Sequence, residues 1–141
     1  MPELPMSEVD WKSRVIDAAK LFGWRYAHFR PARTKYGWVT PMEGDKGFPD
    51  LVLVRPPRLI LAELKVHPPT QKAGRPTEEQ AEWLRQLALV DGCEAYVWRP
   101  PDWQSVYLTL AQDSYASRHQ SQPAAALGDP AHADTAPAGL R

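Results

Sequence analysis

Two acidic residues and a lysine interrupt a hydrophobic stretch in the middle of the chain. Asp50 and Glu63 flank two aliphatic runs, 51–54 and 59–64, which are separated by the sequence Arg-Pro-Pro-Arg. Short aliphatic runs on either side of a proline turn predict a β-hairpin. Pairing outward from the two prolines places Asp50 directly opposite Glu63, on one face of the hairpin. Lys65 projects to the same face, because side chains alternate along a strand.

The rest of the predicted hairpin makes two opposed carboxylates costly. In the same register Val52 pairs with Leu61, and both faces are apolar, as in a central strand pair that is covered on both sides. Like charges placed opposite each other destabilise a sheet, and charges beside buried strands are usually paired or metal-bound. A divalent cation that prefers oxygen ligands, Mg²⁺ or Mn²⁺, would relieve this repulsion, which indicates a metal site at this end of the hairpin. The alternative is that Lys65 simply forms an ion pair with Asp50 or Glu63 at the strand end.

Helix and strand signals place this hairpin inside an α/β chain. Ser7, with Asp10 three residues later, predicts a helix start, and Thr77 with Gln80 predicts a capping box. Asp102 is expected to cap a short last helix. The expected elements in chain order are a helix over 7–22, a strand over 24–30, a loop over 31–46, the hairpin, a loop over 67–76, a helix over 77–91, a strand over 94–99 and a helix over 102–110.

Composition limits the class of protein. The chain has 141 residues, 43% of them hydrophobic, which suits one folded domain. We expect a flexible N-terminus over 1–6, the domain over 7–111 and a disordered tail over 112–141, where Ala, Pro, Ser and Asp replace periodic residues. The one cysteine, Cys93, excludes an intramolecular disulfide framework and fits a small core residue. No run reaches transmembrane length and the N-terminus does not resemble a signal peptide, so we expect a cytoplasmic protein.

The charge distribution is uneven although the formal net charge is zero. Residues 12–85 hold 14 Lys and Arg against 8 Asp and Glu, so this part of the chain is basic, as phosphate binding needs. Ordinary solvated lysines would give the same count. The loop over 31–46 also carries Tyr36 and Trp38, which suit stacking on exposed bases or simply pack the loop down. The candidate DNA-binding residues are Arg30, Arg33, Lys35, Lys46, Lys72 and Arg75.

These motifs resemble a known nuclease superfamily. Pro49-Asp50 followed by Glu63-Leu64-Lys65 resembles the signature of the PD-(D/E)xK, restriction-endonuclease-like nucleases. Gly-Phe-Pro-Asp-Leu over 47–51 and Gln-Ala-Glu-Trp-Leu over 80–84 are most similar to the virus-type replication-repair nuclease (VRR-NUC) domain of that superfamily. The resemblance covers 7–110 and implies an αβββαβα core, with a central mixed sheet flanked by helices. It also implies the small stand-alone form that occurs among phage and bacterial members.

The resemblance further implies roles for particular residues. Asp50, Glu63 and the backbone carbonyl of Leu64 would hold Mg²⁺ or Mn²⁺, and Lys65 would act beside them. Gln80 would lie near the active centre, although it could do no more than cap its own helix. Glu8 would point to the same metal site from the first helix and complete it through a water or a second metal. An acid in a first helical turn is favourable on dipole grounds alone, which is the other explanation of Glu8.

The expected function is a metal-dependent DNA endonuclease with no organic cofactor and no membrane partner. Its expected substrates are branched, such as Holliday junctions or flaps, in replication, recombination or repair. Symmetric cleavage of a four-way junction would require a homodimer. The alternative from another class is a DNA-binding module that has lost catalysis and keeps the same fold. An enzyme acting on small molecules is disfavoured, because the sequence has no phosphate-cradling glycine loop and no nucleophile elbow.

Overall fold

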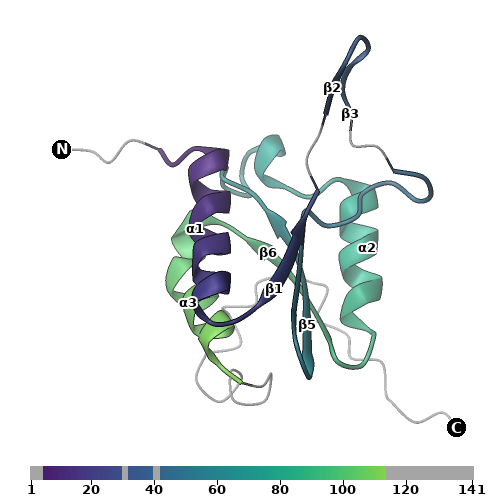
Figure 1. The fold of residues 1–141 in the computed structure, drawn as a ribbon. Coiled ribbons are helices and arrows are strands. Elements are labelled where there is room, and N and C mark those ends of the chain that lie inside the picture. Colours follow the sequence, from purple (N-terminus) through teal and green to yellow (C-terminus); the bar gives the residue numbers. More distant parts are fainter. Residues whose placement is uncertain (1–4, 30–31, 40–41, 114–141) are drawn as a thin grey trace, which may run out of the picture.

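The computed structural model describes residues 5–29, 32–39 and 42–113 (Figure 1). Both helices and strands occur along this part of the chain, as the sequence predicts. The elements are α1 (Glu8–Leu21), β1 (Arg25–His28), β2 (Ala32–Thr34), β3 (Gly37–Val39), β4 (Leu51–Arg55), β5 (Arg58–Leu64), the 3₁₀ turn η1 (Lys72–Gly74), α2 (Glu78–Ala88), β6 (Cys93–Trp98), the 3₁₀ turn η2 (Pro100–Asp102) and α3 (Trp103–Ala111).

Four strands form the main sheet in the order β1-β4-β5-β6. The β1–β4 and β4–β5 pairs are antiparallel, whereas β5 and β6 are parallel and are joined through α2. Val52 pairs with Leu61 and Val54 with Leu59, which confirms the predicted hairpin register. The sheet is therefore mixed, and β4 and β5 are its two central strands, as both apolar faces indicated.

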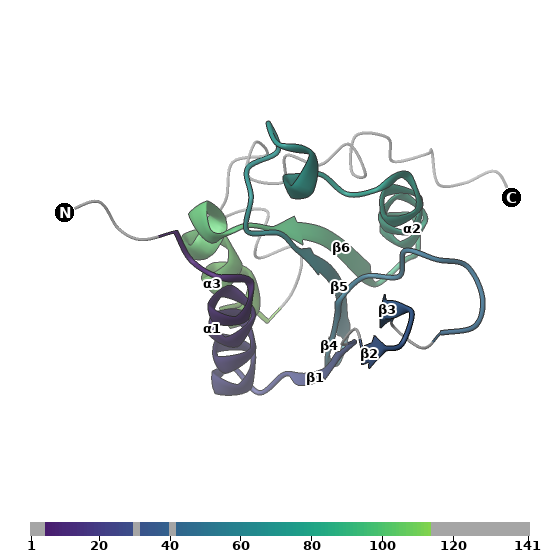
Figure 2. The same ribbon diagram turned by 90° about the horizontal axis from the view of Figure 1, so that it is seen from above.

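Helices cover both faces of this sheet. Seen from above, α1 and α3 lie together on one side and α2 lies on the other (Figure 2). Leu51, Leu53 and Ile60 are fully buried in one cluster with residues of α1 and α3, because strand side chains alternate between the two faces. Leu61 and Leu84 are buried outside that cluster. This arrangement confirms the expected α/β class, with a central mixed sheet flanked by helices.

Two of the three helix caps predicted from the sequence form their side-chain hydrogen bonds. Ser7 Oγ accepts from the Asp10 N–H at 3.1 Å, and Thr77 forms the predicted capping box at the start of α2. Asp102 is the N-cap residue of α3, as predicted, but its side chain makes no capping hydrogen bond to that helix. Its carboxylate instead accepts from the Arg99 N–H at 3.0 Å, because residues 100–102 form a 3₁₀ turn whose start needs an acceptor.

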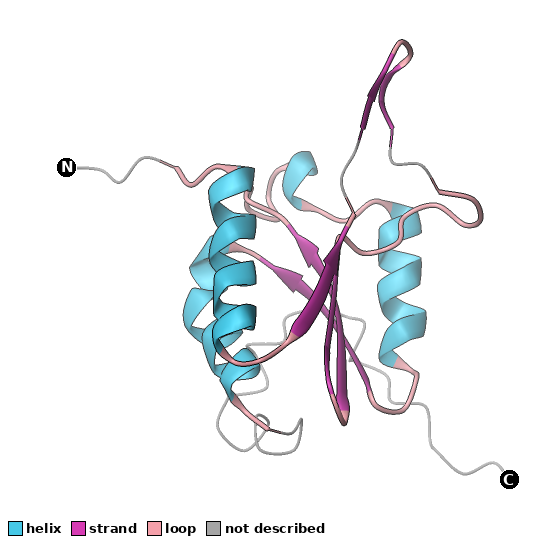
Figure 3. Ribbon diagram, viewed as in Figure 1, coloured by secondary structure: helices cyan, strands magenta, loops and turns pink. Residues whose placement is uncertain are grey.

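The structure also corrects the prediction of a loop over 31–46. The described part of that segment contains β2 and β3, which pair as a separate two-stranded sheet that projects from the body (Figures 1 and 3). Thr34 Oγ1 accepts from the Tyr36 N–H at 3.1 Å and lies 3.0 Å from the Gly37 carbonyl, to which it donates. Gly37 has φ +111°, a backbone conformation that favours glycine, so the turn is closed by local contacts.

The hairpin turn ties the sheet to the C-terminal helix. Arg58 is buried and makes two hydrogen bonds with the Glu94 carboxylate, at 2.8 and 2.7 Å. It also donates to the Thr109 carbonyl at 2.8 Å, and Arg55 donates to the Leu110 carbonyl at 3.0 Å. The arginines on either side of the two prolines therefore hold the end of α3, which the sequence did not indicate.

Two further expectations concern the character of the chain. Cys93 is buried, as a small core residue should be. In the part of the chain that the structure describes, no helix has the length and apolar character needed to cross a bilayer. The N-terminal residues 1–4, Arg30 and the tail over 114–141 lie outside the described residues.

Candidate active site

The two acidic residues lie at the same end of the central strand pair. Asp50 comes directly before β4, and Glu63 is one residue from the end of β5. Asp50 Oδ2 accepts a hydrogen bond from the Leu64 N–H at 3.1 Å, so its side chain reaches across to the neighbouring strand. The Asp50 carbonyl accepts from the Phe29 N–H at 3.0 Å and continues the pairing with β1. The predicted convergence of Asp50 and Glu63 therefore follows from the confirmed register.

Glu63 is a buried carboxylate whose hydrogen bonding is incomplete. The residue is only 2% exposed, yet Oε2 has no hydrogen-bond partner within the described residues. Burial, the negative charge of Asp50 and a hydrogen bond that the two carboxyls share when one is protonated raise the pKa of Glu63 to about 8. The nearby Lys65 lowers this pKa but does not offset the other causes. The site therefore has an excess of negative charge when both carboxyls are ionised.

Lys65 makes the ion pair that the simpler explanation of the motif requires. Its Nζ lies 3.6 Å from Glu63 Oε1, and its backbone N–H donates to the Trp98 carbonyl at 3.0 Å. This ion pair uses Oε1 and leaves Oε2 without a donor. A structural ion pair alone thus does not account for the second carboxylate oxygen.

Gln80 serves both of the roles that the sequence left open. Its Oε1 accepts from the Thr77 N–H at 2.9 Å, which completes the capping box. That bond orients the amide, so that Nε2 donates to Glu63 Oε1 at 2.9 Å. Gln80 therefore joins the N-terminus of α2 to the buried carboxylate, and a residue that only capped its helix would lack the second contact.

The segment before Asp50 is held tightly against α2. Gly47 has φ +92°, and a Cβ atom at this position would lie 2.6 Å from the Glu79 carbonyl carbon. Next along the chain, the Phe48 ring packs edge-on between Phe29 and Trp83, with centroid distances of 5.5 and 5.0 Å. The Gly-Phe-Pro-Asp and Gln-Ala-Glu-Trp-Leu motifs are thus in contact, which explains physically why both bear on the position of Asp50.

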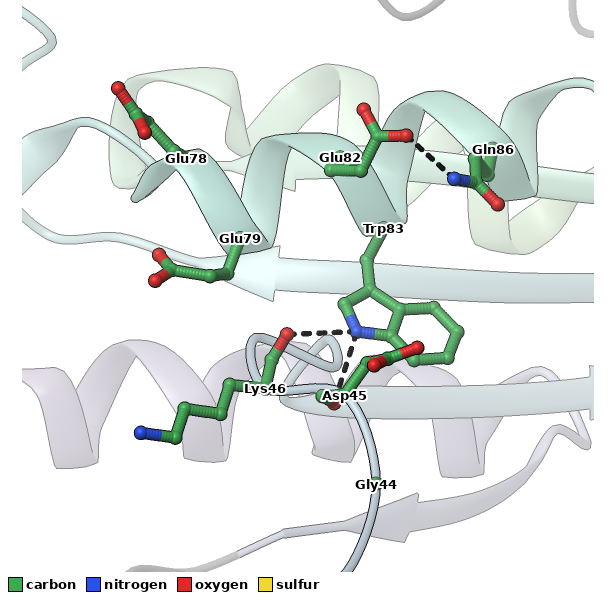
Figure 4. A pocket seen from close by; sticks show the side chains of 8 residues that line it. All are labelled: Gly44, Asp45, Lys46, Glu78, Glu79, Glu82, Trp83 and Gln86. Carbon is green, nitrogen blue, oxygen red and sulfur yellow. Dashed lines mark hydrogen bonds between the residues drawn. The ribbon is translucent and has the colours of Figure 1, made fainter.

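Figure 4 shows the anchor of the loop that leads into this segment. The Trp83 indole N–H donates to the carbonyls of Asp45, at 3.3 Å, and Lys46, at 2.9 Å. Around it lies a cleft of about 570 Å³ between the loop and α2, which contains neither of the opposed acids. The carboxylates of this cleft are exposed, and Glu82 is already bound to Arg85 and Gln86. We therefore assign the cleft the structural role that its Trp83 hydrogen bonds show, which is to anchor the loop. The residues that line it are Gly44, Asp45, Lys46, Glu78, Glu79, Glu82, Trp83 and Gln86.

A second, larger cleft contains the predicted catalytic residues. It has a volume of about 730 Å³ and is open to solvent. Asp50, Glu63, Lys65 and Gln80 line it, together with the exposed Glu8 of α1. All five predicted catalytic residues are therefore brought to one cleft.

The first turn of α1 is held beside this cleft, because α1 and the Lys65 backbone share one hydrogen-bond acceptor. The Trp11 indole N–H donates to the Trp98 carbonyl at 3.0 Å, and the same carbonyl accepts from the Lys65 N–H. This places Glu8, one turn before Trp11, at the Lys65 end of the sheet. Among the described residues, however, no three His, Cys, Asp or Glu side chains converge as a metal centre. The role of Glu8 through a water molecule or a second metal therefore stays a prediction.

The basic residues predicted to bind DNA lie outside the lining of the cleft wherever the structure describes them. Five of them are described, and all five are exposed: Arg33, Lys35, Lys46, Lys72 and Arg75. Arg30 is the sixth and falls outside the described residues. Sequence reasoning missed Lys12, which does line the cleft and lies one helical turn after Glu8. That spacing was the available signal.

Asp50 and Glu63, with the Leu64 carbonyl and the exposed Glu8, are the oxygen donors of this cleft that could hold a hard cation. Comparisons of the chain with protein-family models, with curated protein sequences and with solved structures found no match. The cleft itself offers two opposed carboxylates, a lysine and an amide in a fixed orientation, and it is open to solvent.

Proposed function

We propose that this chain is a metal-dependent phosphodiesterase acting on DNA. More particularly, we propose a restriction-endonuclease-like endonuclease of the VRR-NUC type. The observation that carries the proposal is Glu63, which is buried opposite Asp50 with a raised pKa and with one oxygen that has no hydrogen-bond donor in the described structure. Natural proteins pair such groups or use them as ligands, because an unpaired buried charge is costly.

The order of the elements supports the finer fold assignment. Without the β2–β3 hairpin, the order is α1, β1, β4, β5, α2, β6 and α3, which is the αβββαβα order of the restriction-endonuclease-like core. The opposed acids lie where the second and third of these strands meet, which supports reading them as the signature of the superfamily. The β2–β3 hairpin is then an insertion between the first and second core strands.

The residues present fit Mg²⁺ or Mn²⁺. Asp50, Glu63 and the backbone carbonyl of Leu64 would hold the ion, since hard cations take one or two carboxylates together with water and substrate phosphate. When bound, the ion would neutralise charge that develops on the phosphate and lower the pKa of a bound water. The free Oε2 of Glu63 and the raised pKa of this residue both favour a positive charge at this position.

The side chains of the chain itself would orient the reacting groups. Lys65, held 3.6 Å from Glu63, would bind a phosphate oxygen and stabilise the attacking hydroxide. Gln80 would keep the Glu63 carboxylate in one orientation through the bond from Nε2. Glu8, which lines the same cleft, would complete the site through a water or a second metal.

Branched DNA is the substrate class that we propose, with Holliday junctions and flaps as the two main forms. The open cleft, lined by Lys12 and Lys65, and the exposed basic residues elsewhere on the surface suit a phosphate backbone. Symmetric resolution of a junction requires two active sites and hence a homodimer, whereas a flap needs one. The solution mass of the protein distinguishes a homodimer, which junction resolution requires, from a monomer, which is enough for a flap.

The test is cleavage of a matched set of labelled DNAs: a four-way junction, a 5′ flap, a 3′ flap, a nicked duplex and a linear duplex. Each is incubated with Mg²⁺, Mn²⁺ or EDTA. We expect metal-dependent cutting that Asp50→Ala and Lys65→Ala abolish while the far-UV circular dichroism spectrum is unchanged. The exposed residues Asp17 and Lys20 of α1 supply matched controls, Asp17→Ala and Lys20→Ala, which should cut normally.

Two results would overturn this proposal in different ways. If Lys65→Ala cleaves DNA as fast as wild type does, the assignment of the active site is wrong. If wild type binds these DNAs but never cuts them, and its affinity rises when Asp50 and Glu63 are neutralised, the protein is a non-catalytic DNA-binding module.

A further inference from the structure

The β2–β3 hairpin exposes aromatic rings that the rest of the fold does not cover. Trp38 is 70% exposed and Tyr36 is 84% exposed. The chain has six tryptophans, and all six lie in described residues. The other five are buried or partly buried: Trp11, Trp24, Trp83, Trp98 and Trp103. The idea that Tyr36 and Trp38 merely pack their segment down is therefore wrong, and the exposure of Trp38 needs another explanation.

Trp38 stands at the wall of the candidate active site. It lines the same cleft as Asp50, Glu63 and Lys65, although the hairpin projects away from the main sheet (Figure 1). It pairs with Arg33 across the hairpin, so the guanidinium and the indole project from the same face. An aromatic surface therefore lies at the wall of the proposed active site, and a cation lies on the same face of the hairpin.

The indole of Trp38 is available for a ligand. Within the described part of the chain its ring makes no ring–ring or cation–π contact, whereas Lys35 lies 5.0 Å from the Tyr36 ring centre at the tip. The turn between the strands is closed by Thr34, so the aromatic rings are presented on an ordered two-stranded frame. Such a frame lowers the entropy cost of stacking on a partner.

We propose that Trp38 stacks on an unpaired base beside the scissile phosphate and thereby selects DNA with a single-stranded branch. This inference rests on the proposed function, because it takes the cleft as the path of a DNA strand. Bases inside a duplex are stacked on one another and offer no free face, whereas an unpaired base does. Arg33 and Lys35 would bind the phosphates that flank this base. Trp38 is thus a specificity-determining residue, and Tyr36 supports it at the tip.

The experiment measures binding in EDTA, so that no DNA is cut. The probes are a forked DNA with 2-aminopurine at its first unpaired nucleotide and a fully paired duplex with 2-aminopurine at the same position. Affinity is read by anisotropy from a distal dye, and stacking is read from 2-aminopurine emission. The variants are Trp38→Ala, the conservative Trp38→Phe and Leu21→Ala. Leu21 is also 70% exposed and lies at the far end of α1 from Glu8, so it controls for the loss of an exposed apolar side chain.

We expect Trp38→Ala to weaken fork binding by about fivefold or more and to leave duplex binding unchanged, as is typical of losing one base–aromatic stack. The change in 2-aminopurine emission should disappear in Trp38→Ala and persist in Trp38→Phe and Leu21→Ala. Equal loss of affinity for fork and duplex, or no loss for either, would overturn the inference. An unchanged fork affinity would instead favour contact of the exposed indole with a protein partner.

The outcome for this hairpin is separable from the outcome for catalysis. If binding to the fork depends on Trp38 but Mg²⁺ or Mn²⁺ never produces cutting, the nuclease proposal fails and the stacking role stands. If cutting occurs with equal affinity of wild type and Trp38→Ala for the fork, only the stacking role fails. Absence of any DNA binding by wild type overturns both.

Discussion

Gln80 links the N-terminus of α2 to Glu63 through a single side-chain amide. Its Oε1 accepts from the Thr77 N–H and its Nε2 donates to Glu63 Oε1, both at 2.9 Å. The capping box that starts the helix therefore also orients the carboxylate at the centre of the cleft. Local helix stability and the geometry of the candidate site are coupled at this residue.

Replacing Gln80 should affect both stability and the acid beside it. Gln80→Ala removes half of the capping box and the donor to a buried carboxylate, so we expect a loss of about 1–3 kcal/mol in the free energy of unfolding. Gln80→Glu keeps an acceptor for Thr77 but places a negative charge beside Glu63, which should raise the pKa of Glu63 further. Urea unfolding and a carboxyl ¹³C NMR titration measure the two effects.

A matched control for this prediction lies on the same helix. Gln86 bonds to Glu82 on the exposed face of α2, so Gln86→Ala should change the free energy of unfolding by less than about 0.5 kcal/mol. Equal losses in Gln80→Ala and Gln86→Ala would show that the contact with Glu63 contributes nothing.

The raised pKa of Glu63 predicts stability that falls as pH rises in the absence of metal. The folded state holds the proton up to about pH 8, whereas an unfolded glutamate releases it near its ordinary pKa of 4.5. Between these values the folded protein binds more protons than the unfolded chain, so the free energy of unfolding decreases with pH, by on the order of a few kcal/mol in total. Unfolding by urea at pH 5, 6, 7 and 8 measures this slope.

Glu63→Gln should remove that dependence. The amide stays neutral at every pH, so this variant should show a flatter pH profile than wild type and exceed its stability at pH 8. Parallel profiles for the two proteins would mean that Glu63 does not titrate in this range.

Metal should stabilise the protein, and more strongly at high pH. Because ligands bind in their deprotonated form, Mg²⁺ or Mn²⁺ should raise the melting temperature more at pH 8 than at pH 6. At a concentration one hundredfold above Kd, the expected stabilisation is about 3 kcal/mol. Differential scanning fluorimetry at matched ionic strength measures the shift, which should vanish in Asp50→Asn and Glu63→Gln. A shift of the same size in these variants would place the metal elsewhere.

Two glycines in the loop before β4 separate backbone strain from close contact. Gly44 and Gly47 both have positive φ, +113° and +92°, but only at Gly47 would an added Cβ atom have neighbours within 4 Å. Gly44→Ala should therefore cost about 1–2 kcal/mol for its conformation alone. Gly47→Ala should cost about 2–5 kcal/mol, because the Glu79 and Gln80 backbone must also move.

This pair of variants also tests the link to the site. Displacement of α2 by Gly47→Ala should reduce DNA cleavage more than its stability loss explains, while Gly44→Ala should cut normally once folded. Similar free energies of unfolding for the two variants, measured in urea, would argue against a tight contact at Gly47.

Much of the candidate site followed from local sequence. The register of β4 and β5 was predictable, because a two-proline turn between short aliphatic runs leaves few ways to pair them. Opposition of Asp50 and Glu63 follows from that register, and the caps at Ser7 and Thr77 follow from hydrogen bonds within one helical turn. These are short-range relationships, in which a few dihedral angles determine which atoms meet.

The failures of sequence reasoning have equally specific causes. Local contacts at Thr34 and Gly37 produce a hairpin where composition alone predicted a loop. At Asp102, a 3₁₀ turn intervenes before the last helix and takes the side chain as its own acceptor. In both places a tight turn formed that the prediction did not include. Such a turn leaves no periodic pattern of residues in the sequence.

The sequence by itself determined the α/β class, the central hairpin and the convergence of two acids with a lysine. Only the tertiary structure decided that Gln80 bonds to Glu63, that Gly47 packs on α2, and that Lys12 and Trp38 reach the same cleft. The physical reason is range. Contacts between elements far apart in the chain depend on how helices pack across a twisted sheet, and residue spacing does not encode that geometry directly.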